Sequence, residues 1–162
     1  MIRLVTPADH ADVRDLNLSA FDGAAEADLV EALRTDGDVV LELVAEEAGE
    51  IAGHILFSRL WADSEGLFVA LAPMAVVPAR QGQGVGSRLV RAGLEFCQEF
   101  GIHAVIVLGH PDYYPRFGFS AEAAGKLKSP YAGSPAYMAK ALEPGALDEP
   151  LTLAYPDAFS RL

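Results

Sequence analysis

The chain has 162 residues, 51% of them apolar, and a formal net charge of −11 at pH 7. This length predicts one domain, residues 1–162, with a single core, and the apolar content argues against a disordered chain. The negative charge argues against nucleic acid as a partner, because binding to a phosphate backbone needs a basic face. It is compatible with a cationic or amine substrate.

No apolar run reaches the length of a membrane span, and the first residues lack the apolar core of a signal peptide. We therefore expect a cytoplasmic protein that does not enter a membrane. The single cysteine, Cys97, excludes an internal disulfide, and its apolar neighbours in a helical segment predict a buried, unreactive thiol. The four histidines are scattered without metal-ligand spacing, so we expect no metal site.

Residues 1–60 predict, in order, a strand, two helices and a β-hairpin. The first strand covers residues 2–5, and the first helix is capped by Thr6 or Asp9 and ends near residue 21. The second helix and the two hairpin strands follow at residues 24–34, 39–46 and 51–60.

Residues 67–100 organise the chain. An apolar strand, residues 67–77, contains Pro73, which cannot donate a strand hydrogen bond and therefore predicts a bulge or an unpaired edge position. A glycine-rich turn follows, and a helix then runs from about Val85 to Phe100. Glycines let a ligand approach the backbone closely, and the free N–H groups at a helix start attract an anion.

The charges around this turn also favour an anion. The chain has 23 Asp and Glu residues, but none lies between Glu65 and Glu95, where Arg80, Arg88 and Arg91 occur. We therefore predict that a phosphate group binds here and that the first two arginines attract it. The plainer alternative is a solvated helix start with ordinary surface arginines.

Two of three phosphate-binding glycine patterns do not fit this turn. A Walker A loop needs Gly-Lys followed by Ser or Thr, and the segment has no lysine. A dinucleotide fingerprint would place its third glycine at Ser87 and needs an acidic residue after the next strand, which ends without one at Val107-Leu108-Gly109-His110. The third pattern, Gln/Arg-x-x-Gly-x-Gly/Ala, is met by residues 81–86.

The remaining residues predict a fifth central strand, a short helix or turn, and two late strands. Their ranges are 103–108, 111–117, 137–142 and 151–155, and residues 121–135 are irregular.

Together these segments resemble the GNAT family of N-acetyltransferases, in particular its bacterial YhbS-like branch. Residues 81–86 are similar to the family's pyrophosphate loop, and residues 114–119 match its Tyr-x-x-x-Gly-Phe element. Residues 135–138 and 155–159 also look like the end of that branch, so the resemblance covers nearly the whole chain. It implies an α+β fold in which a mixed, mostly antiparallel central sheet is flanked by helices and the fourth and fifth strands splay apart.

The resemblance further implies acetyl-CoA as cosubstrate and direct transfer of its acetyl group to a primary amine. The backbone of Met74, Ala75 and Val76 is expected to pair with the pantetheine amides. The phosphates are expected to bind at Gln81, Gly82, Gln83, Gly84, Val85, Gly86 and Ser87.

Tyr114 of the Tyr-x-x-x-Gly-Phe element is expected to be the general acid that protonates the leaving thiolate. A phenol stays protonated at neutral pH and can donate, because its ordinary pKa is ~10. The alternative is a packing aromatic residue, which is the interpretation we favour for the neighbouring Tyr113.

The acceptor amine is not identified by the sequence, although a small molecule is favoured over a protein amine. In the family the first two helices shape the acceptor pocket, so the candidates here are Phe21, Asp22, Glu26 and Asp28. A solvated helix face also explains each of them.

The general base is equally open, with Glu65, His54 and His110 as candidates and a water chain as the alternative. His54 lies within a strand, which favours a packed core residue over a position near the acceptor. A non-catalytic acyl-CoA-binding regulatory domain and a nucleotide-binding protein stay open as other functions. The oligomeric state is open as well, a homodimer included.

Overall fold

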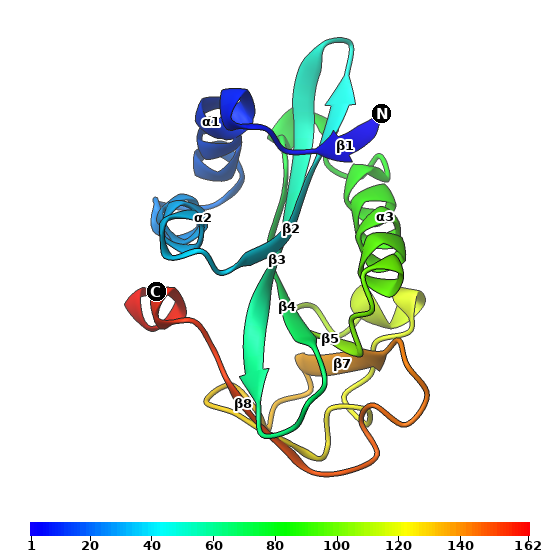
Figure 1. Ribbon diagram of the computed structural model, residues 1–162. Coiled ribbons are helices and arrows are strands. Elements are labelled where there is room, and N and C mark those ends of the chain that lie inside the picture. The colour runs from blue at the N-terminus through cyan, green and yellow to red at the C-terminus, as the bar shows by residue number, and fades with distance from the viewer.

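The structure, a computed structural model that describes residues 1–162, is a mixed β-sheet with helices on both faces (Figure 1). Its strands are β1 (Ile2–Leu4), β2 (Val39–Glu47), β3 (Glu50–Ala62), β4 (Phe68–Val76), β5 (Ala104–Leu108), β6 (Leu127–Lys128), β7 (Tyr137–Ala141) and β8 (Leu151–Ala154). Its α-helices are α1 (His10–Ala20), α2 (Ala25–Asp36) and α3 (Val85–Glu99).

The main strands lie in the order β1-β2-β3-β4-β5-β7. β8 pairs with the end of β3 and with the short β6. Neighbouring strands are antiparallel except for β4 with β5 and β6 with β8, which are parallel. The predicted α+β fold with a mixed, mostly antiparallel sheet is therefore confirmed.

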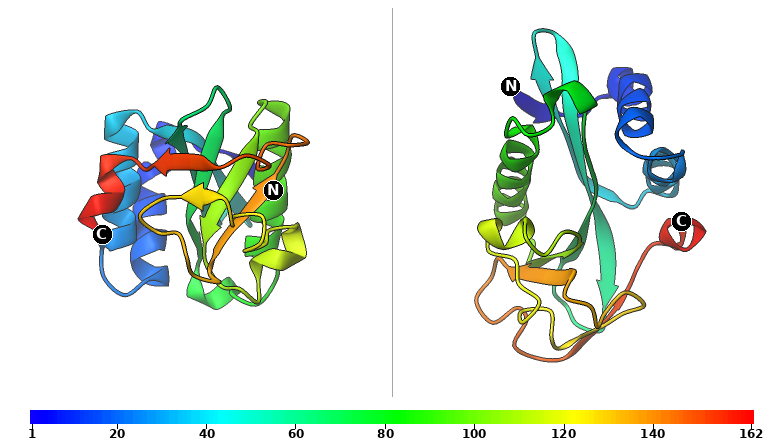
Figure 2. Two further views of the ribbon diagram at one scale, coloured as in Figure 1. Left: turned by 90° about the horizontal axis from the view of Figure 1, so that it is seen from below. Right: turned by 180° about the vertical axis from the view of Figure 1, so that it is seen from behind.

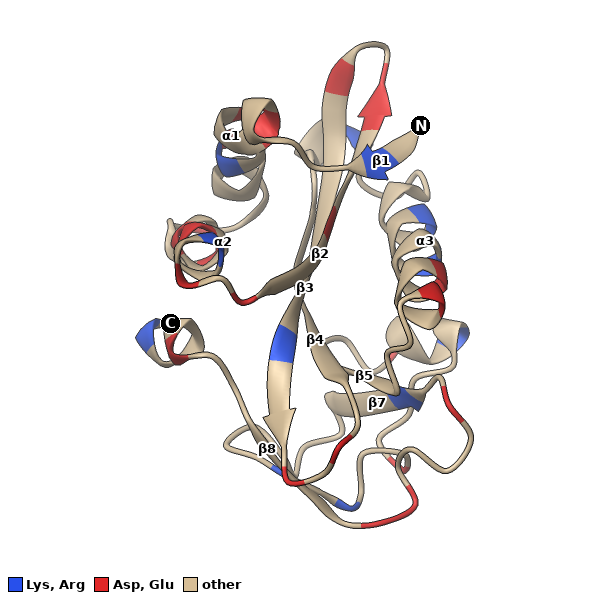
Figure 3. Ribbon diagram, in the orientation of Figure 1, with Lys and Arg blue, Asp and Glu red and all other residues tan.

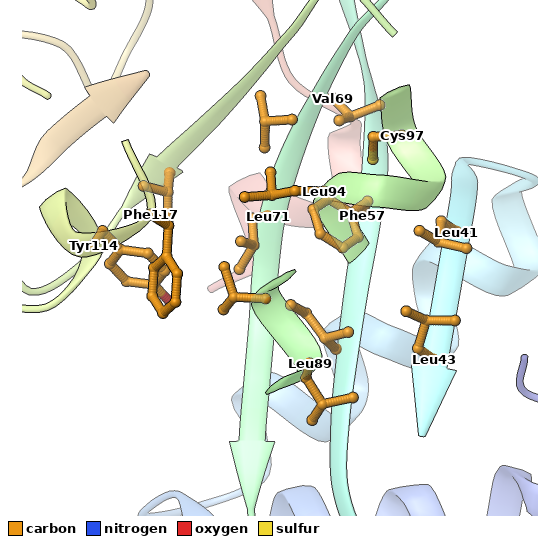
Figure 4. Close-up of a cluster of buried hydrophobic side chains, with 14 of the residues drawn as sticks. Leu41, Leu43, Phe57, Val69, Leu71, Leu89, Leu94, Cys97, Tyr114 and Phe117 are labelled. Carbon is orange, nitrogen blue, oxygen red and sulfur yellow. The ribbon is translucent and has the colours of Figure 1, made fainter. Parts of the chain in front are cut away.

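The helices form two layers on opposite sides of the sheet (Figures 1 and 2). α3 covers one face, where Leu43, Phe57 and Leu89 belong to one buried cluster (Figure 4). α1, α2 and a C-terminal 3₁₀ turn (Asp157–Arg161) cover the other face, where a second cluster contains Leu56. Successive strand residues point to opposite faces, so Leu56 and Phe57 serve different cores.

The predicted helices and main strands are present, with ends that differ by a residue or two. The sequence did not predict β6 or the last 3₁₀ turn, which are too short to show a hydrophobic period. The segment at residues 121–135 was predicted to be irregular, yet it contains β6, which ties it to β8.

A bulge in β4 marks the centre of the sheet. Leu56 of β3 stands opposite two residues of β4, Ala72 and Pro73, while the residues on either side pair one to one. Pro73 therefore causes the irregularity that its missing N–H predicted.

The same strand parts from its other neighbour near this bulge. β4 pairs with β5 only over Phe68–Ala70, so the two parallel strands splay apart beyond that point, as predicted. Met74, Ala75 and Val76 pair with β3 alone. Their opposite backbone edge has no strand partner and is open to an extended ligand.

Candidate active site

The glycine-rich turn between β4 and α3 has an open backbone. Gly82 and Gly84 adopt φ angles of +76° and +85°, a region that glycine enters without the steric cost of a Cβ. A Cβ added at Gly82 would meet no atom within 4 Å. This face of the turn is therefore free for a ligand to approach the main chain.

The start of α3 supplies free donors beside the turn. The first hydrogen bond across this helix start runs from the N–H of Arg88 to the carbonyl oxygen of Gly84, at 3.1 Å. The N–H groups of Val85, Gly86 and Ser87 thus have no acceptor within the helix. They lie at the positive end of the helix dipole, which suits a phosphate.

Two glutamine side chains brace the turn. Gln81 Nε2 donates to the Val76 carbonyl oxygen at 3.0 Å, and Gln83 Nε2 donates to that of Ala79 at 3.3 Å. Gln81 also lines the cavity described below, together with Gly82. The glutamine amides hold the turn in shape, which leaves its backbone N–H groups for a ligand.

The arginines near this turn are less free than the sequence suggested. Glu47, at the acidic tip of the β2–β3 hairpin, pairs with both Arg80 and Arg88, the latter at 2.6 Å between Nη2 and Oε1 (Figure 3). Arg91 lies over the Phe117 ring instead, 5.2 Å from its centroid. The stretch of sequence without acidic residues therefore has an acidic partner in space, Glu47, contributed by a distant segment.

A cavity of about 740 Å³ extends from the turn along the free edge of β4. Of its 21 lining residues, 15 are hydrophobic, which is typical of a small-ligand site with few polar groups. At the end nearest the turn it is lined by Met74, Val76, Gln81 and Gly82. Ala75 is buried and points away, as expected for the residue between two lining residues of a strand.

Tyr114 also lines this cavity, from a 3₁₀ turn (Tyr114–Phe117) that follows β5. Its ring meets those of Tyr113 and Phe119 edge to face and lies beside Phe117 at the border of the core cluster (Figure 4). Burial, and to a smaller extent Tyr113, raises the pKa of Tyr114 to about 12. The hydroxyl is therefore protonated at neutral pH and can act as a donor.

Gly109 makes room for the Tyr114 ring. A Cβ at Gly109 would lie 2.5 Å from Cε2 and 2.9 Å from Cδ2 of Tyr114, closer than carbon atoms approach in folded proteins. No role for Gly109 was predicted from the sequence, although a glycine directly after an apolar strand often marks a place where another group approaches the backbone closely.

Tyr113 holds the surrounding elements together. Its hydroxyl lies 2.9 Å from Ser87 Oγ, so it joins the start of α3 to the turn that carries Tyr114. The guanidinium of Arg116 covers its ring at 4.6 Å from the centroid. These contacts agree with the structural role that the sequence favoured for Tyr113.

His54 is a core residue, as the sequence analysis favoured, and the alternative position beside an acceptor is wrong. It is fully buried, with Nε2 2.7 Å from Glu42 Oε2 and Nδ1 3.3 Å from Asn17 Nδ2. Burial lowers the pKa of His54, so the ring is neutral at neutral pH. Hydrogen bonds from His54 and Arg34 lower the pKa of Glu42 to about 2 although burial opposes this, so the carboxylate stays charged.

The other residues considered for chemistry differ in their access to the cavity. His110 lines it, whereas Glu65 is exposed in the turn between β3 and β4 and does not. Cys97 is fully buried in α3, and burial raises the pKa of its thiol to about 12. The prediction of a buried thiol is confirmed, and such burial is typical of unreactive cysteines.

The far end of the cavity lies under the first two helices. Of the four candidates there, Phe21 and Glu26 line the cavity. Asp22 is exposed and does not line it, and Asp28 pairs with Arg14 at 3.1 Å on the outer side of the helices. Three further aromatic residues complete this end and were not predicted from the sequence: Tyr131, Tyr155 and Phe159.

No helix of the structure is both long and apolar enough to pass through a membrane. No three His, Cys, Asp or Glu side chains lie close enough together to hold a metal ion.

Comparison with known proteins identifies the family. The model of the acetyltransferase (GNAT) family matches residues 10–119, more than half of the chain. The protein belongs to the GNAT family of acetyltransferases. The family and the enzyme class predicted from the sequence are thereby confirmed.

Bacterial proteins of this family resemble the chain over most of its length. The uncharacterized N-acetyltransferase YjhQ of Escherichia coli K12 is 43% identical over 130 residues, 76% of this chain and 72% of its own. The uncharacterized N-acetyltransferase YhbS of the same strain is 39% identical over 136 residues, 83% of this chain and 81% of its own.

Solved structures show the same fold. The crystal structure of YhbS from Escherichia coli in complex with CoA has a TM-score of 0.92 and 36% identity, over 100% of this chain and 92% of that one. A GNAT family acetyltransferase from Brucella melitensis in complex with acetyl-CoA has a TM-score of 0.82 and 33% identity, over 98% of this chain and 97% of that one.

Proposed function

We propose that the protein is an acetyl-CoA-dependent N-acetyltransferase that moves the acetyl group directly to a primary amine of a small molecule. One observation carries this proposal: the open edge of β4 and the open glycine turn line the same cavity as Tyr114 and the residues of the acceptor end. The crystallised relatives contain CoA or acetyl-CoA, which supports that cosubstrate here.

The residues present fit acetyl-CoA along its length. The pantetheine arm has amide groups, and the unpaired edge of Met74–Val76 offers backbone partners to them. The phosphates need donors without crowding, and the N–H groups from Gly82 to Ser87 offer them where a glycine leaves open space. When bound, acetyl-CoA supplies the acetyl thioester.

The residues at the reacting centre favour direct transfer. Backbone N–H groups near Met74–Val76 can polarise the thioester carbonyl. His110 lines the cavity and is a candidate general base, with a water chain as the alternative. The buried Cys97 is not placed to form a covalent acyl-enzyme.

Tyr114 is proposed to assist the departing sulfur. Its pKa of about 12 is well above the ~8.5 of an ordinary thiol, so a free tyrosinate would be a costly intermediate. The role that fits is a hydrogen bond from the phenol to the leaving sulfur, which stabilises the developing negative charge as the proton is transferred.

An assay of CoA-thiol release against a broad panel of amines tests this function, with the acetylated product identified by mass spectrometry. We expect release that depends on a small amine. Binding of acetyl-CoA without amine-dependent release would indicate a non-catalytic acyl-CoA-binding domain. Displacement of acetyl-CoA by NAD or ATP would indicate a nucleotide site, and acetylation of peptides alone would indicate a protein acetyltransferase.

A further inference from the structure

The cavity contains a single acidic side chain. The chain has 23 Asp and Glu residues, yet Glu26 is the only one that lines the cavity, and no Lys or Arg lines it. Glu26 takes part in no ion pair, unlike Asp28 and Glu31 on the same helix, which both pair with Arg14. No basic side chain of the protein therefore pairs with Glu26 in the cavity.

The carboxylate of Glu26 also lacks a donor from the protein. Its Oε1 atom is buried, and no protein group within hydrogen-bond distance donates to it. Leaving a buried carboxylate oxygen without a donor costs free energy, and such groups in folded proteins call for an explanation. Because Glu26 lines the cavity, a ligand with a positively charged N–H donor can supply this hydrogen bond and the opposite charge once the carboxylate turns toward it.

The cavity that Glu26 lines also has an aromatic wall. The Tyr131 and Tyr155 rings meet at 83° with centroids 4.8 Å apart, and the Tyr155 and Phe159 rings meet at 76° with centroids 5.3 Å apart. Phe21 lines the same end of the cavity. Rings that meet nearly at right angles form a concave apolar surface, which suits a flat or compact hydrocarbon group.

This wall is assembled by the C-terminal segment. The 3₁₀ turn at residues 157–161 lies beside α2 in all views of the ribbon (Figures 1 and 2), and Phe159 shares a buried cluster with Leu29 and Val30 of that helix. A hydrogen bond holds Tyr155 in place, because its hydroxyl lies 3.2 Å from that of Tyr137. The aromatic wall is thus held in place in the cavity before any ligand arrives.

We infer that the acceptor is a small primary amine with an aromatic or similarly apolar body. Its ammonium group pairs with Glu26, and its body lies against Tyr131, Tyr155 and Phe159. This inference rests on the proposed acetyl transfer and adds the class of the substrate. The protonated amine is the prevalent form at neutral pH, so one proton passes from it to water before the neutral nitrogen attacks the thioester.

A pair of matched amines tests the inference in the wild-type protein. Phenethylamine and phenylalanine differ by one carboxylate next to the amine, which Glu26 would repel. We expect kcat/KM with acetyl-CoA to be at least about tenfold higher for phenethylamine. Equal use of the two compounds, or a clear preference for the aliphatic polycation spermidine, would overturn the inference.

The substitution Glu26→Gln removes the charge and keeps the shape. The KM for phenethylamine should rise roughly ten- to hundredfold, as expected for a lost charge-assisted hydrogen bond, while the KM for acetyl-CoA stays constant. Glu31→Gln is the matched control, because Glu31 is half exposed on the same helix and does not line the cavity. An unchanged KM for phenethylamine in Glu26→Gln would overturn the inference.

The aromatic wall is tested separately with Tyr131→Ala. We expect its KM to rise more for phenethylamine than for ethylamine, which lacks the ring, whereas Trp61→Ala, an exposed ring outside the cavity, should change neither. Equal effects on both amines would overturn the assignment of this wall. The proposed function fails in a different way, since acetyl-CoA would then not bind or no amine of any kind would release its thiol.

Discussion

The two ends of the cavity are built from different parts of the polypeptide. The cosubstrate end consists mainly of backbone: the open edge of Met74–Val76, the glycine turn and the first N–H groups of α3. The acceptor end consists of side chains, with Glu26 and three aromatic residues contributed by segments far apart in the sequence. One end is thus specified by backbone conformation and the other by side-chain identity.

This difference suits a family whose members share one cosubstrate but use different acceptors. A backbone surface keeps its hydrogen-bonding groups whatever the neighbouring side chains are, so it suits a cosubstrate that stays the same. A pocket of side chains changes with every substitution, so it suits an acceptor that differs between proteins. Tyr114 lines the same cavity as both ends, and the proposed role puts the reaction beside it.

The largest effect is expected at Tyr114, in the cavity that both ends share. Tyr114→Phe keeps the ring and removes only the hydroxyl, so kcat should fall about 10²–10⁴-fold while the affinity for acetyl-CoA barely changes. Steady-state kinetics with a good acceptor and calorimetry with acetyl-CoA measure the two quantities. A kcat within about threefold of wild type, well below that range, would mean that water supplies the proton.

The next effect is confined to the cosubstrate end. In Gly86→Asp, the new Cβ would lie 3.2 Å from Met74 Cε, and the carboxylate would face the phosphates at the start of α3. Affinity for acetyl-CoA should fall roughly tenfold or more. Gln98→Glu adds the same charge at the other end of α3 and should bind normally. Normal binding by a folded Gly86→Asp protein would remove the turn from the site.

A smaller effect should follow from displacing Tyr114 without altering it. Gly109→Ala pushes a methyl group against the Tyr114 ring, so kcat should fall by about tenfold as the hydroxyl shifts. Gly93→Ala is the control, because its Cβ would meet Phe57 at 2.4 Å in the core under α3. Both variants should unfold at lower temperature, but only Gly109→Ala should lower kcat. An equal loss of kcat in both would mean that general destabilisation is the cause.

The smallest effect concerns the arginines beside the turn. Glu47→Gln releases Arg80 and Arg88 from their shared carboxylate, so acetyl-CoA should bind roughly two- to fivefold more tightly at low salt. The gain should disappear at high salt, because exposed charges are screened. Calorimetry at two ionic strengths measures the affinity of wild type and variant for acetyl-CoA. Weaker binding in the variant would show that Glu47 holds the arginines in a useful position.

The cosubstrate end of the cavity could be predicted from the sequence, whereas most of the acceptor end could not. The reason is again that one end is made of backbone and the other of side chains. Backbone recognition requires Gly82, Gly84 and the bulge at Pro73 at fixed spacing along one segment, so its pattern is local and visible. The acceptor wall joins Tyr131 and Phe159 to the first helices through tertiary packing, which leaves no local pattern.

Two other features could not be predicted from the sequence because they also depend on tertiary packing. The pairing of Glu47 with the arginines depends on where the β2–β3 hairpin ends in space, which a count of charges along the chain does not reveal. Gly109 was visible as a glycine, but its role became clear only from the position of the Tyr114 ring. In contrast, an apolar strand context was enough to identify His54 as a core residue.

The central claim is that the main chain of β4 and of the glycine turn holds acetyl-CoA. Residue-resolved amide hydrogen exchange, with and without saturating acetyl-CoA, tests it most directly. We expect slower exchange for free-edge amides within Met74–Val76 and for the amides from Gly82 to Ser87, with no comparable change in α2. Saturating binding of acetyl-CoA that leaves the exchange of both segments unchanged would contradict the account.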